Sequence, residues 1–148
     1  MKTGEVCNRR VVSVRAGASL AEVSRLMREA HVGSVVVVDD ARPLRAVGIV
    51  TDRDIVVEAV AAGIDPATLT VGEIMGTSLV VARESEDALE SLRTMRRRGV
   101  RRLPVVDDEG ALCGIVTLDD LLEAGSAALN DVVQAIASER ALESWRRM

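Results

Sequence analysis

The chain contains one internal repeat. Residues 26–40 align with residues 94–108 at an offset of 68, and both segments end in Val-Val-Asp-Asp. The sequence Gly-Ile-Val-Thr then stands at residues 48–51 and again at 114–117, at an offset of 66, because the loop before it is two residues longer in the first unit. A unit of about 60 residues with one small sheet cannot cover both faces of that sheet by itself. The two units must therefore pack against each other.

Each unit shows the same succession of apolar patterns, which predicts the order β-α-β-β-α. A β-branched run is followed by an amphipathic helix, with Ser19 or Ser85 as its N-cap. Two apolar strands come next, joined by a polar turn, and Thr51 or Thr117 then begins a second helix. The strands are predicted at residues 11–14, 34–39 and 46–50 in unit one, and at 79–81, 103–107 and 112–116 in unit two.

The first helix of each unit is predicted to bury one apolar face, because its apolar residues recur three or four positions apart. The members of this face are Leu20, Val23, Met27 and Ala30 in unit one, and Leu89, Leu92 and Met95 in unit two.

These elements divide the chain into two repeats, a linker and a tail. We expect repeat one at residues 6–64, a linker with short helical turns at 65–78, repeat two at 79–125 and a C-terminal helix at 126–148. The predicted fold class is α/β (α+β), with the two repeats packed sheet to sheet in pseudo-two-fold symmetry. The tail helix has an apolar stripe and needs a partner surface; the stripe consists of Leu129, Val132, Val133 and Ile136.

Composition narrows the class of protein. Of the 148 residues 48% are hydrophobic, yet Trp145 is the only aromatic residue among Phe, Trp and Tyr, so the core is aliphatic. No apolar run approaches the roughly 18 to 20 residues of a membrane span, and no signal segment is visible, so we expect a cytoplasmic protein. Cys7 and Cys113 are far apart and His31 is the single histidine, which argues against a disulfide framework and a zinc site. A net charge of −4 argues against general nucleic-acid binding.

The most specific local pattern is Gly-Ile-Val-Thr-x-x-Asp, which occurs in both units. It places Thr51 and Asp54, and likewise Thr117 and Asp120, at the start of a helix. Free N–H groups and the helix dipole favour a phosphate there, and a carboxylate can accept two hydrogen bonds from a ribose diol. The same spacing is that of a capping box, in which both residues serve only to stabilise the helix start. Spacing alone leaves both interpretations open.

The whole pattern resembles a tandem pair of cystathionine-β-synthase (CBS) domains, often called a Bateman module. The resemblance covers roughly residues 6–131. It is carried by the duplicated β-α-β-β-α unit, by Val-Val-Asp-Asp before the turn and by Gly-Ile-Val-Thr-x-x-Asp after it. Unit two is especially similar to the family at residues 99–107, Gly-Val-Arg-Arg-Leu-Pro-Val-Val-Asp. The resemblance implies that the Thr and Asp contact the phosphate and ribose of an adenosine-type ligand, whose base lies between the repeats.

The resemblance also implies two pseudo-symmetric ligand sites, each with a junction from one repeat and a wall from the other. One site would use Thr117, Asp119 and Asp120, with Ile115 against the base, Arg101 toward a phosphate, and Val12 and Val32 as the wall. The other would use Thr51, Arg53, Asp54 and Ile49, facing Val80 and Val100. Because Phe and Tyr are absent, branched aliphatic side chains would hold the adenine ring.

Unit one departs from the family pattern where its hairpin begins. Gly33-Ser34 stand where unit two has Arg101-Arg102, and Val36 replaces the proline at position 104. The site that uses Thr51 would thus lose a phosphate partner, which Arg53 could replace. A desolvated charge-assisted contact is worth roughly 1.5 to 3 kcal/mol, so we expect unequal affinities.

These features predict a regulatory protein and not an enzyme, since no nucleophile has an evident base and no phosphate-binding glycine-rich loop is present. The expected ligand is AMP, ADP, ATP or S-adenosylmethionine. The resemblance implies a homodimer formed through helices, and we expect an output protein of unknown identity. A ligand-independent dimerisation or interaction module is the alternative, motivated by the tail helix. Nucleic-acid binding through the arginines at 96–98 is a third interpretation, weakened by the lack of aromatic stacking platforms.

Overall fold

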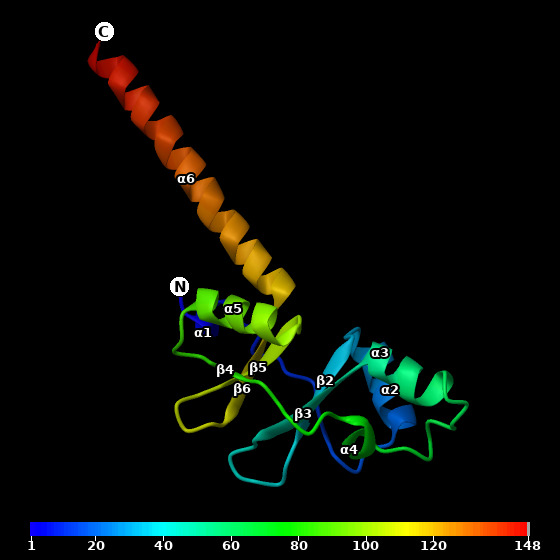
Figure 1. Cartoon of the computed structure of the whole chain (residues 1–148). Coiled ribbons are helices and arrows are strands. Elements are labelled where there is room, and N and C mark those ends of the chain that lie inside the picture. The colour runs from blue at the N-terminus through cyan, green and yellow to red at the C-terminus, as the bar shows by residue number, and fades with distance from the viewer. Residues whose placement is uncertain (148) are drawn as a thin grey trace.

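The computed structural model of the chain describes residues 1–147 and contains two three-stranded sheets (Figure 1). In each sheet the central strand pairs in parallel with the first strand and antiparallel with the third. The hairpin strands agree with the sequence prediction to within one residue. The first sheet is β1 (Ser13–Arg15), β2 (Ser34–Val38) and β3 (Ala46–Thr51), and the second is β4 (Ala82–Arg83), β5 (Arg102–Val106) and β6 (Leu112–Thr117).

The two hairpins have the same register, which confirms the repeat at the level of strand pairing. Val36 lies opposite Ile49, and Pro104 lies opposite Ile115. Both hairpins shift register one position before the end of the central strand. The central strands β2 and β5 are buried from their second residue to their last. The sheets lie next to each other at the centre of the molecule, with α5 over one and α2 and α3 beside the other (Figure 1).

The first strand of each sheet begins later than its β-branched run. The predicted strands were at 11–14 and 79–81, whereas β1 begins at Ser13 and β4 at Ala82. Parallel pairing fixes these starts: Ser13 lies opposite Val36, and Ala82 lies opposite Val105. Val11 and Val12, which precede β1, line a cavity between the repeats, whereas Val80, which precedes β4, packs against the core of repeat two.

The longer helices follow the strands in the predicted order. The first helices are α2 (Leu20–Ala30) and α5 (Ala88–Arg98), and the second ones are α3 (Asp52–Ile55), continued by a π-helical turn at Val56–Val60 (η1), and α6 (Leu118–Arg146). Ser19 caps α2 as predicted, and Leu20, Val23 and Met27 are buried beneath it. The second helix of repeat two runs without a break into the tail, so that α6 projects away from both repeats (Figure 1). Among residues 1–147, no helix is both long and apolar enough to cross a membrane.

The prediction for the start of α5 was wrong. Its N-cap is Asp87, whose carboxylate accepts a hydrogen bond from the N–H of Leu89. Ser85 instead donates its hydroxyl hydrogen to Asp108. Because α5 begins at Ala88, Asp87 and not Ser85 stands at the N-cap position, and Asp is as good an N-cap as Ser.

The buried face of α5 also differs from the prediction. Met95 is buried as expected, but Leu89 and Leu92 are exposed and Ser91 is buried in their place. The hydroxyl of Ser91 forms a hydrogen bond of 2.7 Å with that of Thr3, which is itself buried. The N-terminal helix thus packs against α5 at Ser91, and Leu89 and Leu92 are left exposed.

Two four-residue helices are exchanged between the repeats. Helix α1 (Thr3–Val6) precedes repeat one but packs on α5, α6, β4 and β6 of repeat two. Helix α4 (Val71–Ile74) precedes repeat two but packs on β3, and Val71 belongs to the core of repeat one. Each repeat therefore completes its core with the segment that precedes the other repeat.

Candidate ligand-binding sites between the repeats

The junction of β6 and α6 forms a complete capping box. The Asp120 carboxylate accepts hydrogen bonds from the N–H (2.8 Å) and the hydroxyl (2.9 Å) of Thr117, both at Oδ2. In return, the Thr117 hydroxyl oxygen accepts from the N–H of Asp120 at 3.1 Å. The corresponding junction in repeat one repeats this geometry, with Thr51 N–H to Asp54 Oδ2 at 2.8 Å and Asp54 N–H to Thr51 Oγ1 at 3.2 Å. The capping interpretation is confirmed at both junctions.

Capping leaves each carboxylate with one unused acceptor. The Oδ1 atoms of Asp54 and Asp120 have no hydrogen-bond partner within residues 1–147, while Oδ2 is fixed by the cap. A carboxylate that is held by one oxygen can accept a hydrogen bond from a ligand hydroxyl with the other. Because the cap already fixes the side chain, ligand binding costs little further side-chain entropy. The cap and a ribose contact are therefore compatible.

A pocket at the Thr117 junction, which we name the Thr117 pocket, is bounded by both repeats. Its cavity volume is about 200 Å³. Thr117, Asp120 and Ile115 come from repeat two, and Val12 and Val32 come from repeat one, as the sequence predicted. The remaining lining consists of Asn8, Arg10, Val11, Gly33, Ser34 and Arg102.

A second pocket at the Thr51 junction, the Thr51 pocket, is larger. Its cavity volume is about 450 Å³, within the range of roughly 300 to 1,000 Å³ that is typical of small-molecule sites. The predicted residues Thr51, Arg53, Asp54, Ile49 and Val100 line it together. The remaining lining consists of Asp52, Gly99, Arg101 and Arg102. Size alone favours this pocket for a whole nucleotide.

Three predicted site residues lie elsewhere. Arg101 lines the Thr51 pocket and not the Thr117 pocket, and its backbone carbonyl accepts from the N–H of Leu118 at the start of α6. Asp119 is outside both linings; its side chain is 85% exposed and forms an ion pair with Arg101 at 3.9 Å. Val80 packs against the core of repeat two.

The arginines are distributed between the two pockets in the opposite way to the sequence expectation, and the inequality of the affinities stays a prediction. The substitution of Gly33-Ser34 for a pair of arginines depletes the Thr117 pocket, which both residues line. The Thr51 pocket instead receives Arg101 and Arg102 in addition to its own Arg53. The first residues of each hairpin thus line the pocket at the strand-to-helix junction of the other repeat. The sequence prediction had assigned them to the junction of their own repeat.

Two further arginines line the pockets and were not predicted from the sequence as site residues. Arg10 lines the Thr117 pocket, where its N–H donates to the side chain of Asn8 at 2.9 Å. Arg102 lines both pockets. The Asn-Arg-Arg run at residues 8–10 was the available signal for Arg10, but its counterpart before repeat two, Gly76-Thr77-Ser78, contains no arginine.

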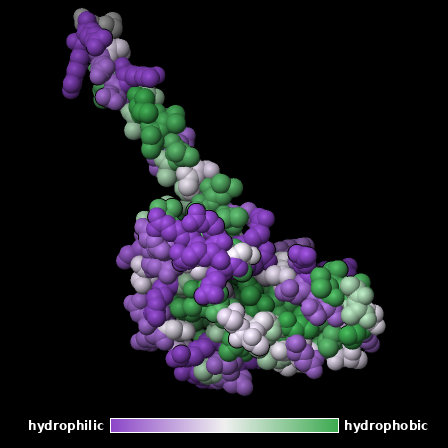
Figure 2. Space-filling view, in the orientation of Figure 1, coloured by the Kyte–Doolittle hydropathy of each residue, from purple (hydrophilic) through white to green (hydrophobic). Residues whose placement is uncertain are grey.

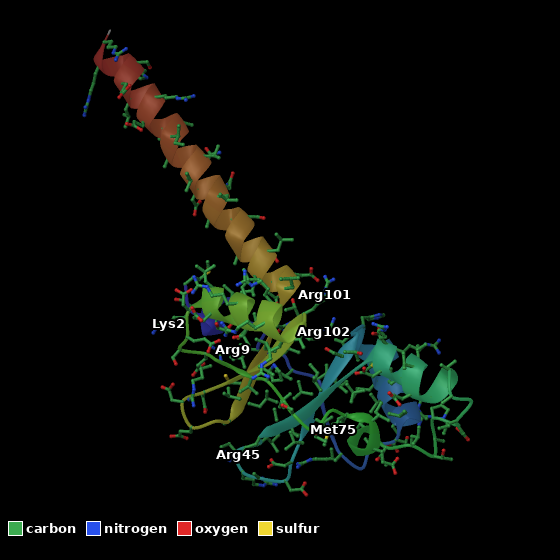
Figure 3. All side chains as sticks on the ribbon, in the orientation of Figure 1. Lys2, Arg9, Arg45, Met75, Arg101 and Arg102 are labelled. Carbon is green, nitrogen blue, oxygen red and sulfur yellow. The ribbon has the colours of Figure 1, made fainter. Side chains whose placement is uncertain are left out.

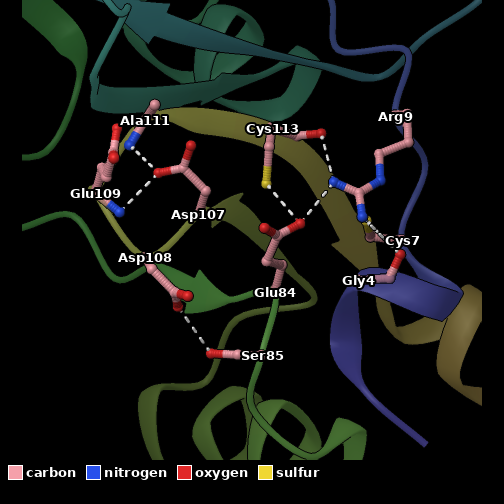
Figure 4. Close-up of polar contacts among 10 residues, drawn as sticks. All are labelled: Gly4, Cys7, Arg9, Glu84, Ser85, Asp107, Asp108, Glu109, Ala111 and Cys113. Carbon is pink, nitrogen blue, oxygen red and sulfur yellow. Dashed lines mark hydrogen bonds and ion pairs between the residues drawn. The ribbon is translucent and has the colours of Figure 1, made fainter.

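The two cysteines lie on either side of an ion pair (Figure 4), and neither of them lines the Thr117 pocket or the Thr51 pocket. Arg9 contacts Glu84 at 2.9 Å, and Cys113 donates to the same carboxylate at 3.7 Å. Burial, followed by the charge of Glu84, raises the pKa of the Cys113 thiol to about 11. Burial likewise raises the pKa of Cys7, against the opposing effect of Arg9. Both thiols are therefore protonated at neutral pH, and within residues 1–147 no three His, Cys, Asp or Glu side chains form a group that could hold a metal ion.

The CBS domain family matches the chain twice, at residues 4–60 and 71–127. The chain belongs to the CBS-domain family. The two matched segments begin within the exchanged helices α1 and α4, so each match includes a helix that packs on the other repeat.

The chain covers nearly all of one curated relative and less than two thirds of another. Hypoxic response protein 1 of Mycobacterium tuberculosis is 36% identical over 141 residues, which are 95% of this chain and 96% of that protein. The uncharacterized protein MK0525 of Methanopyrus kandleri is also 36% identical, over 123 residues that span 83% of this chain but 62% of its own length.

Solved structures share the fold of the CBS pair. Hypoxic Response Protein I, solved with two coordinated zinc ions, has a TM-score of 0.73 and 33% identity, covering 84% of this chain and 98% of that one. The cytosolic domain of the Mg²⁺ channel MgtE, solved in complex with ATP, has a TM-score of 0.70 and 36% identity, covering 83% of this chain and 48% of that one. The magnesium transporter MgtE of Thermus thermophilus is 38% identical over 133 residues, 26% of its length.

Proposed function

We propose that this CBS pair is a cytoplasmic regulatory module that binds an adenosine-type nucleotide between its repeats and has no catalytic role. The observation that carries the proposal is the Thr51 pocket, in which a carboxylate with a free acceptor oxygen, three arginines and two branched aliphatic side chains line one cavity. Asp54 would accept from the ribose, and Arg53, Arg101 and Arg102 would neutralise phosphate. The ATP bound to the cytosolic domain of MgtE, at 36% identity, supports this ligand class.

The base would be held without aromatic stacking. Ile49 and Val100 provide branched aliphatic surface in the Thr51 pocket, and Ile115, Val12 and Val32 provide it in the Thr117 pocket. Dispersion and shape are weaker than stacking on an aromatic ring, so the ribose and phosphate contacts would supply most of the affinity. Ligands with phosphates, AMP, ADP or ATP, are therefore favoured over S-adenosylmethionine, whose sulfonium would meet three guanidinium groups.

Regulation would follow from the fact that each pocket has walls from both repeats. A ligand that contacts both walls binds best at one relative orientation of the repeats and shifts the population toward it. An output protein would recognise that orientation.

We further propose that the chain acts as a homodimer through α5 and α6. Leu89 is 58% exposed, and with Leu92 it borders an apolar cavity of about 270 Å³ between these helices. Beyond this cavity, α6 carries further exposed apolar side chains (Figure 2). The first half of α6 carries Asp119, Asp120, Glu123 and Asp131 and no basic residue, whereas its end carries Arg140 and Arg146 beside Glu139 and Glu143. Antiparallel pairing of two copies would bring these two arginines near the acidic start of the partner helix.

A ligand-independent interaction module is the second candidate function, and the exposure of α6 favours it. Such a protein would dimerise or bind its partner with the same affinity whether or not a nucleotide is present.

Isothermal titration calorimetry and thermal unfolding of the full chain with AMP, ADP, ATP, S-adenosylmethionine and adenosine test the proposal. A ligand that binds only the native state raises its stability by RT ln(1 + [L]/Kd), so binding predicts a rise in Tm. We expect the largest rise with a phosphate-bearing nucleotide and a smaller one with adenosine. The absence of heat and of any Tm change with all five compounds would contradict nucleotide sensing and leave the interaction module.

A further inference from the structure

One side chain, Arg102, lines both candidate pockets. It stands at the first position of β5, opposite Thr117 in the hairpin register, and lies where the two repeats meet (Figure 3). The Thr117 pocket and the Thr51 pocket share no other lining residue. Whatever occupies the two pockets would therefore meet at this guanidinium.

Arg102 is also uncommitted. Within residues 1–147 it forms no ion pair, whereas its neighbour Arg101 is paired with Asp119. It is half-buried, so its charge is less screened than that of an arginine on the open surface. A partly buried guanidinium without a carboxylate partner is ready to bind an anion from either side.

The pseudo-symmetric position does not offer a second such group. Ser34 corresponds to Arg102 at the repeat offset of 68, and it lines the Thr117 pocket. Perfect symmetry would have placed two arginines at the centre, one for each ligand. This chain has one.

We propose that Arg102 couples the two pockets, so that a phosphate-bearing ligand in one pocket weakens the binding of a second in the other. The proposal rests on the nucleotide binding proposed above. A guanidinium binds a phosphate through two parallel N–H groups on one edge of a rigid plane, so it cannot serve two phosphates in different pockets equally well. The second ligand finds Arg102 oriented toward the first and gains less from it. The result is negative cooperativity between two sites of one chain.

Calorimetric titration of the full chain with ATP tests this coupling. Ile115→Trp fills the Thr117 pocket and Ile49→Trp fills the Thr51 pocket, so each variant reports the affinity of the pocket left open. In the unaltered chain we expect the first ATP to bind with the stronger of these two affinities. The second ATP should bind at least about tenfold more weakly than ATP binds to the same pocket in the variant whose other pocket is filled. This factor corresponds to the loss of one charge-assisted contact. Val12→Trp and Val100→Trp are the replacements if circular dichroism shows that either isoleucine variant is unfolded.

Arg102→Ser, which copies the residue at position 34, should weaken ATP binding in both pockets and remove the tenfold difference. Arg101→Ser is the matched control, because Arg101 lines the Thr51 pocket alone. It should weaken that pocket and leave the coupling unchanged. Adenosine, which has no phosphate for Arg102, should bind the two pockets independently.

The outcomes separate this inference from the proposed function. If no adenosyl compound binds the unaltered chain, nucleotide binding itself is wrong. If two ATP molecules bind with their single-pocket affinities, or if only one blocked variant binds ATP, the pockets are not coupled and only this inference is overturned. Coupling that persists in Arg102→Ser, or that adenosine shows equally, would overturn it as well.

Discussion

The Sγ atom of Cys7 lies directly over the backbone of Gly114, at 2.7 Å from the point where a β-carbon would stand. Met75 lies over Gly48 in the same way, with its Sδ atom at 2.5 Å from the corresponding point. Cys7 and Met75 are 68 residues apart and immediately follow the exchanged helices α1 and α4. The glycine of each Gly-Ile-Val-Thr motif is therefore the place where a repeat accepts the helix that precedes the other.

We predict that Gly114→Ala destabilises the protein by about 1 to 3 kcal/mol through overpacking. The methyl group would meet Cys7 Sγ and also the carbonyl oxygen of Asn8 at 3.1 Å, which is backbone and cannot swing away. Urea denaturation followed by circular dichroism measures this loss.

Two further variants show whether the close approach is the cause. Gly17→Ala is the control, because a β-carbon there meets nothing within 4 Å, and it should change stability by less than about 0.5 kcal/mol. Adding Cys7→Ala to Gly114→Ala should restore part of the stability, since the two residues are in contact and their effects are not additive. Strict additivity of the two changes would contradict the contact.

Asp120→Ala should lower both the stability of the protein and its affinity for ligand. Oδ2 of Asp120 caps α6, and Oδ1 is available to a ligand hydroxyl. Loss of the cap costs about 1 kcal/mol, a loss that leaves the protein folded. The double variant Asp54→Ala with Asp120→Ala should abolish most of the Tm gain that ATP gives the unaltered chain. Differential scanning fluorimetry with and without ATP measures both effects. Asp119→Ala is the control, since its exposed side chain lies outside both pockets, and it should keep the full gain.

Cys113 should be slow to react with iodoacetamide in the folded protein. Its pKa is raised from 9.0 to about 11 by burial and by Glu84, so at pH 8 its thiolate fraction is about 100-fold lower than for an unperturbed thiol. Mass spectrometry of the labelled protein should show slow modification that becomes rapid in urea. Because the folded pKa is the higher one, the stability from this group is fully present below pH 9 and is lost as the pH rises toward 11. Cys113→Ser should remove this part of the alkaline destabilisation, and equal rates of labelling in the folded and unfolded protein would contradict it.

The accuracy of the sequence prediction depended on how local each feature is. The hairpins and the caps at Thr51 and Thr117 follow from contacts within a few residues, and they were predicted correctly. The exchange of α1 and α4 was not predictable, because a four-residue helix carries no pattern that says which repeat it covers. The position of Arg101 failed for the same reason, since the neighbour of a hairpin start is decided by how two repeats pack. A cavity lies at each of the two motif junctions, where the family resemblance implied ligand sites, and ligand binding at these junctions stays a prediction.

The tail of α6 should pair with a second copy of the chain. Leu122, Leu129, Val133 and Ile136 lie on one side of the helix, and Leu129 is 69% exposed. A helix that contacts nothing is only marginally stable in water, so these side chains need a partner to retain it. We predict that Val133→Glu with Ile136→Glu gives a monomer in size-exclusion chromatography with light scattering, whereas the unaltered chain gives a dimer.

Ser138→Glu adds a charge on the opposite side of the same helix and should leave the dimer intact. The monomeric variant should also lose helical circular dichroism while keeping its ATP response, because both pockets lie outside the tail. A monomeric unaltered chain at all concentrations would show that α6 has another partner.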